Sequence, residues 1–170
     1  TPYIGQDDAP AKVSKLFTAA PTGISWADAG FVQPFLNRLN TTLTFGATEY
    51  VGRRYSERST NTGAGGRTST NVILSTTRGE LVIAPASGKI DLAEDLGGDY
   101  GTTLVIDHGA GVRTIFYGLS DIDIKAGQQV KQGQTLATCG KTTVVEMRIG
   151  TVPIDPIAVW RGQCNGLKYY

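Results

Sequence analysis

The sequence predicts a mainly β protein with an N-terminal arm that contains one or two short helices. Glycine contributes 22 of the 170 residues, and glycine-rich turns between short β-branched segments are typical of sheets. From residue 71 onward, short apolar segments recur with no long helical pattern between them. This spacing favours a β-sandwich or a small barrel, formed by one domain plus an arm.

The arm carries few structural signals. Residues 11–17 favour a short helical turn, which the Pro21-Thr22-Gly23 sequence ends. Residues 28–40 are a second helix candidate with apolar side chains on one face, although Pro34 lies within it. Residues 41–45 predict a strand.

Residues 52–70 are polar and glycine-rich, which predicts a long exposed loop. Its Gly63-Ala64-Gly65-Gly66 sequence lacks the Gly-Lys-Ser/Thr ending of a phosphate-binding loop. The loop contains four candidate partner-binding residues, Arg53, Arg54, Arg58 and Arg67. An ordinary solvated loop is the alternative interpretation.

The predicted strands follow closely in the rest of the chain. They cover residues 72–74, 80–84, 103–107, 112–117, 129–130, 135–138 and 144–149. The Gly109-Ala110-Gly111 sequence has the turn chemistry of a β-hairpin.

Composition and charge exclude several classes of protein. The net charge is +1, from 16 basic and 15 acidic residues, which argues against a nucleic-acid partner. No apolar run approaches the length of a membrane span. The first residues show no signal peptide, so a signal or an anchor removed from a longer precursor stays open.

Two cysteines, Cys139 and Cys164, predict either one disulfide or two buried thiols. The polar surroundings of Cys164 favour the disulfide. Such a bridge would place the protein in an oxidising, extracytoplasmic compartment.

Several segments are informative through their order. They are residues 79–90 (GELVIAPASGKI), 100–109 (YGTTLVIDHG), 114–120 (TIFYGLS), 130–137 (VKQGQTLA), 146–149 (EMRI) and 153–156 (PIDP). This succession resembles the LytM-type (M23) zinc peptidase domain, whose members cut peptidoglycan cross-bridges or regulate enzymes that do. The resemblance divides the chain into an extension (1–68), the degenerate LytM-like domain (69–160) and a tail (161–170).

The resemblance also implies where a zinc site should lie. Such domains use a His-x-x-x-Asp pair, a His-x-His pair and a histidine before Leu-Ser. The corresponding positions hold Ser69, Ile73, Gly118, Thr142 and Val144. Isoleucine, valine and glycine side chains offer no lone pair, and a hydroxyl is a poor zinc ligand. The chain has a single histidine, so a shifted register cannot supply the ligands. We therefore expect no zinc, no other cofactor and no metal-activated water.

The resemblance then favours a non-catalytic binding or scaffolding module of the cell envelope, acting outside the cytoplasm. Its partner would be an envelope protein or peptidoglycan. The family contains activators of cell-wall amidases and the sporulation protein SpoIIQ, a degenerate LytM domain that docks a partner.

Three alternatives remain. The first is a cell-wall zinc endopeptidase with an unforeseen ligand set. The second is a biotinyl or lipoyl carrier, although Lys89 and Lys131 lack the flanking Met or Asp of a modified lysine. The third is a nucleophilic Cys139/His108 pair, although no local feature lowers the thiol pKa. We expect His108 to be structural, at a strand end near a turn.

Overall fold

The structure is a computed structural model that describes residues 10–17, 60–61, 67–68, 72–109, 111–150, 152–154, 156 and 160. The described helix is α1 (Ala11–Ser14). The strands are β1 (Thr60–Asn61), β2 (Arg67–Thr68), β3 (Val72–Ser75), β4 (Leu81–Ile83), β5 (Gly88–Asp95), β6 (Thr102–Gly109), β7 (Val112–Ile122), β8 (Gln129–Val130), β9 (Thr135–Ile149) and β10 (Val152–Ile154). The mainly β fold with a short N-terminal helix is therefore confirmed.

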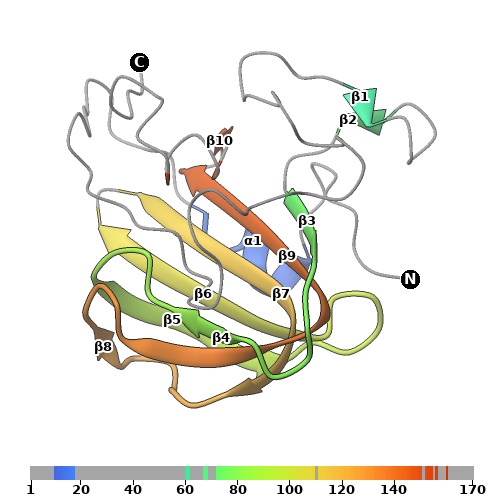
Figure 1. The fold of residues 1–170 in the computed structure, drawn as a ribbon. Helices are drawn as coiled ribbons and strands as arrows, with labels where there is room; N and C mark the ends of the chain where they lie inside the picture. Colours follow the sequence, from blue (N-terminus) through green and yellow to red (C-terminus); the bar gives the residue numbers. More distant parts are fainter. Residues whose placement is uncertain are drawn as a thin grey trace.

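A strongly curled antiparallel sheet forms the domain (Figure 1). Its strands run in the order β10-β9-β7-β6-β5-β8, and β3 and β4 also pair with β9. The long strand β9 pairs with β7 along one side and with β3, β4 and β10 along the other. Strand β9 therefore joins elements that are far apart in the sequence.

The predicted hairpin is confirmed by β6 and β7, which pair antiparallel. Gly109 and Gly111 flank the turn with φ angles of 93° and 85°. Backbone with positive φ strongly favours glycine, because a Cβ atom crowds the following carbonyl there.

Two predicted details differ from the structure. Residues 135–138 and 144–149, expected as two strands, belong to the single strand β9, because partners on both sides continue the pairing between them. The 52–70 segment is not loop throughout, since β1 and β2 pair within it. The helix candidate 28–40 and the strand candidate 41–45 lie outside the described residues.

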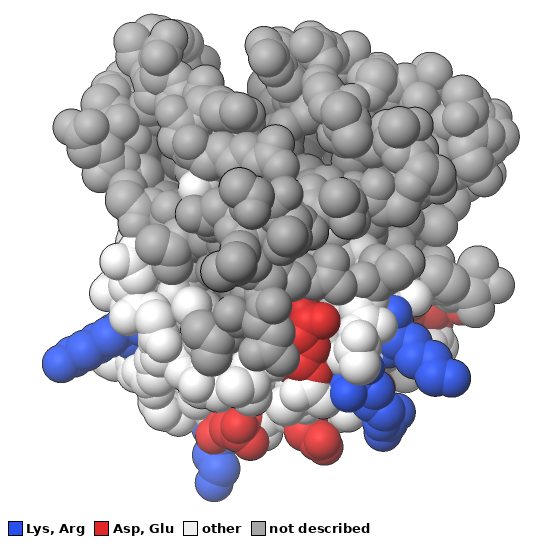
Figure 2. All heavy atoms as spheres, in the orientation of Figure 1, with Lys and Arg blue, Asp and Glu red and all other residues white. Residues whose placement is uncertain are grey.

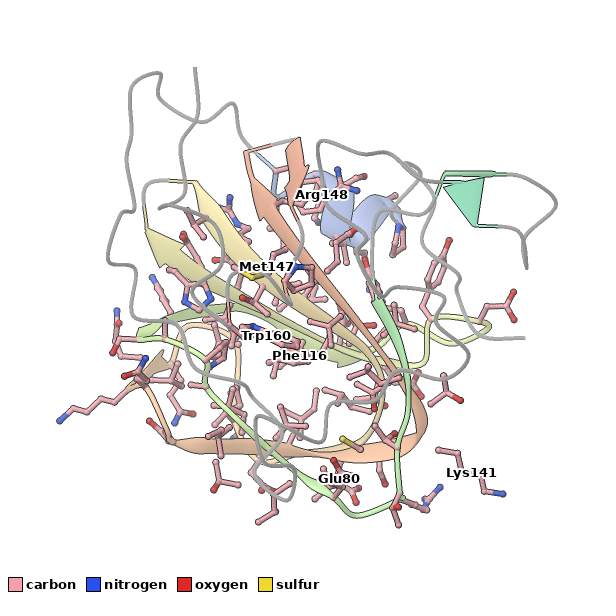
Figure 3. The ribbon with its side chains drawn as sticks, turned by 45° about the horizontal axis from the view of Figure 1, so that its top comes forward. Glu80, Phe116, Lys141, Met147, Arg148 and Trp160 are labelled. Carbon is pink, nitrogen blue, oxygen red and sulfur yellow. The ribbon has the colours of Figure 1, made fainter. Side chains whose placement is uncertain are left out.

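Both faces of the sheet are buried. The inner face, enclosed by the curl, carries the main apolar cluster with Phe116, Met147 and Trp160 at its centre (Figure 3). The outer face carries a second cluster, named here the outer-face cluster: Val13, Leu92, Val105, Ile115, Tyr117 and Val144. Alternate residues of β6 and β7 supply the two clusters, which explains why apolar residues run almost without interruption along these strands.

Figure 2 shows Lys and Arg side chains interspersed with Asp and Glu on the described surface in view. No single-sign patch extends over that part of the face. No helix among the described residues has the length and apolar character needed to cross a membrane.

Candidate functional site

The structure brings together the strands that carry the positions at which the sequence resemblance places zinc ligands. Ile73 of β3 lies directly opposite Val144 of β9, and Val144 lies opposite Tyr117 of β7 on its other side. Gly118 follows Tyr117, and Thr142 lies two residues before Val144 on β9. Ser69 lies outside the described residues.

Gly118 leaves no room for a side chain. Its φ angle is 76°, and a Cβ atom there would lie 2.4 Å from the carbonyl oxygen of Thr142. Gly140 is equally tight, since its Cβ would lie 2.5 Å from the carbonyl oxygen of Gly118. The register between β7 and β9 shifts on either side of Leu119, next to this contact. An imidazole at position 118 would therefore require the backbone of β7 or β9 to move.

Val144 lies in the apolar interior instead of facing a cavity. It is buried in the outer-face cluster, where Ile115, Tyr117 and Val13 of α1 are neighbours in the same cluster. This residue is therefore part of the apolar core. The side chain of Ile73 is not among those described.

The residues that the structure describes at these positions do not fit a zinc ion. Among the described residues, no three or more His, Cys, Asp or Glu side chains gather where they could hold a metal. The positions on the sheet offer glycine, valine and a threonine hydroxyl, and none of these resembles the imidazole, thiolate and carboxylate donors that zinc uses.

Two charged residues follow Val144 on the same side of β9. Glu146 and Arg148 are both buried, and Nη2 of Arg148 donates to Oε2 of Glu146 at 3.1 Å. The guanidinium of Arg148 also lies over the ring of Phe17, 4.5 Å from its centroid. Figure 3 shows Arg148 beside α1. The attraction between these two opposite charges offsets part of the free-energy cost of removing them from water. A single buried charge would have no such compensation.

Helix α1 covers this part of the outer face. Val13 is fully buried in the outer-face cluster, and Leu16 and Phe17 pack against it. Lys12 forms an exposed ion pair with Glu94 at 3.2 Å. Burying a valine stabilises by roughly 2 kcal/mol, a cation–π contact by about 1 kcal/mol and an exposed ion pair by less than about 1 kcal/mol. The attachment of α1 is therefore worth a few kcal/mol.

His108 lies near the end of β6, as expected, and bridges two neighbouring elements. Its Nδ1 lies 2.9 Å from the carbonyl oxygen of Ser87, and its Nε2 lies 2.8 Å from Oγ1 of Thr114. A carbonyl oxygen only accepts, so in the neutral ring Nδ1 carries the proton and the Thr114 hydroxyl donates to Nε2. Burial lowers the pKa of His108 from 6.5 to about 4, against the opposing effects of the Ser87 hydrogen bond and the Asp107 charge.

Cys139 and His108 do not form a catalytic pair. Cys139 lies opposite Leu119 in the register of β9 and β7, whereas His108 contacts Thr114. Thr114 and Leu119 are five residues apart on β7, which corresponds to about 17 Å along a strand. Cys139 is buried in the main apolar cluster, and Cys164 lies outside the described residues, so the disulfide stays a prediction.

The predicted arginine surface is not described. Arg53, Arg54 and Arg58 lie outside the described residues, and only the backbone of Arg67 is placed, opposite Asn61. The carrier candidates Lys89 and Lys131 lie in or next to the paired strands β5 and β8. Reasoning from sequence missed Gly140, the Glu146–Arg148 pair and the docking of α1. The spacing of Val13 and Phe17, four residues apart, was the available signal for an apolar helix face.

The chain resembles known proteins in its sequence. The sequence pattern of Peptidase family M23 matches residues 67–156. The chain belongs to this family. An uncharacterized metalloprotease from Haemophilus influenzae is 32% identical over 95 residues, which cover 52% of this chain and 20% of that protein. This M23 chain therefore spans about a fifth of the length of the curated relative that it matches.

Solved structures share the M23 fold. Lysostaphin, from Staphylococcus simulans, is similar with a TM-score of 0.56 and 21% identity, over 62% of this chain and 48% of lysostaphin. A complex of SpoIIIAH and SpoIIQ gives a TM-score of 0.50 and 23% identity, over 54% of this chain and 71% of that one. The resemblance inferred from the sequence motifs is thus confirmed at the level of family and fold.

Proposed function

We propose that this M23 domain is a zinc-free, non-catalytic module of the cell envelope that binds a partner. The observation that carries the proposal is the contact between Gly118 and the Thr142 carbonyl, which excludes a side chain at a ligand position. The burial of Val144 in the outer-face cluster supports it independently. A domain without the metal has no Lewis acid and no activated water for peptide hydrolysis.

The family and the fold supply the setting of the proposal. We propose an extracytoplasmic location and a partner that is an envelope protein or peptidoglycan. SpoIIQ, a solved structure of similar fold, was determined in complex with the protein SpoIIIAH. By analogy with SpoIIQ, we propose a binding function for this chain. The shared fold and the residues at Gly118 and Val144 support this analogy.

Zinc content and hydrolysis test the proposal together. The chain is purified without chelator, dialysed against zinc and analysed by plasma mass spectrometry, and the same sample is incubated with peptidoglycan. We expect less than about 0.1 zinc per chain, because no suitable donor set is present, and no release of muropeptides. A catalytically active zinc peptidase of the M23 family, treated identically, is the positive control for metal loading. About one zinc per chain with peptide cleavage would instead support the alternative, a cell-wall zinc endopeptidase with an unforeseen ligand set.

A further inference from the structure

We draw no further inference here: the strongest candidate, the charged cluster of Asp91, Asp107 and Arg113 on strands β5, β6 and β7, has its charges paired with one another, and the Nη1 atom of Arg113, which has no hydrogen-bond partner among the described residues, is closed to solvent, so the structure leaves no space for a ligand beside it.

Discussion

At the scale of single residues, Gly118 is the position where the backbone leaves no room for a side chain. Its positive φ and its contact with the Thr142 carbonyl restrict it to glycine. A histidine at this position would therefore require the backbone of β7 or β9 to move, in addition to the change of side chain.

The first prediction compares two glycines. Gly118→Ala should destabilise the protein by about 3 kcal/mol or more, because the new methyl group meets a carbonyl oxygen in addition to the strain of positive φ. Gly79 is the matched control, since its φ is 92° and nothing lies within 4 Å of its Cβ position. Gly79→Ala should cost about 1 kcal/mol. Urea unfolding measures both, and equal losses would show that the contact at Gly118 relaxes easily.

The second prediction concerns His108, the sole histidine of the chain. Burial lowers its pKa to about 4 in the folded protein, so the unfolded chain binds its proton more readily. The contribution of neutral His108 to the free energy of unfolding is then fully present above pH 6.5, and it is lost as the pH falls toward 4. We expect a loss on the order of 2 kcal/mol, less than the full shift implies because the side chain is half-buried.

Urea unfolding between pH 7.5 and 4.5 checks this dependence, with His108→Gln as the control. The variant should lack the part of the decline that begins near pH 6.5, because carboxylates titrate mainly below pH 5. Parallel pH profiles for wild type and variant would show that His108 does not control this region.

At the scale of elements, the docking of α1 on β9 links the N-terminal arm to the sheet. The arm gave no motif, yet its helix covers the face on which Val144 lies. The unit that folds therefore includes a segment more than fifty residues before the region matched by the family pattern. A fragment that begins at residue 67 would lack this cover.

The third prediction measures the α1–β9 contact. In a double-mutant cycle with Phe17→Leu and Arg148→Met, the coupling energy should be about 1 kcal/mol, since the guanidinium lies over the ring. A second cycle combines Arg148→Met with Lys15→Ala, whose side chain is exposed, and should give a coupling close to zero. Similar couplings in the two cycles would mean that the cation–π contact contributes nothing specific.

At the scale of the whole molecule, one curled sheet buries residues on both faces and has one long strand at its centre. The inner face contains the main cluster, and Cys139 of β9 is a fully buried member of it. The C-terminal part of the chain returns to this cluster through Trp160. Cys164 follows Trp160 by four residues and lies outside the described residues, so the disulfide with Cys139 stays a prediction.

The fourth prediction is that reduction of this disulfide lowers stability. A bridge closing a loop of about 25 residues should contribute about 3 kcal/mol. Protein purified without reductant should show no thiols after unfolding, and its unfolding midpoint in urea should fall on reduction. The Cys164→Ser variant should have the same urea unfolding midpoint as the reduced wild type, and this midpoint should not change when reductant is added. Two titratable thiols in the unfolded, unreduced protein would establish the buried-thiol alternative.

The sequence alone determined the family and the β class. The order of the motifs and the glycines at the hairpin ends are local sequence signals, so they can be identified without a structure. Strand β9 was predicted as two pieces because Gly140 and its polar neighbours imitate a turn. Pairing on both sides overrides that local preference.

Only the tertiary structure decided that Gly118 has no room for a side chain and that α1 covers Val144. The lack of room for a Cβ atom at Gly118 depends on where β9 lies relative to β7, and the burial of Val13 depends on which sheet face α1 meets. Both are contacts between residues distant in the sequence. Local composition specifies that Val13 and Val144 are apolar, but the free energy that joins them comes from burying their surfaces together, which only the folded chain achieves.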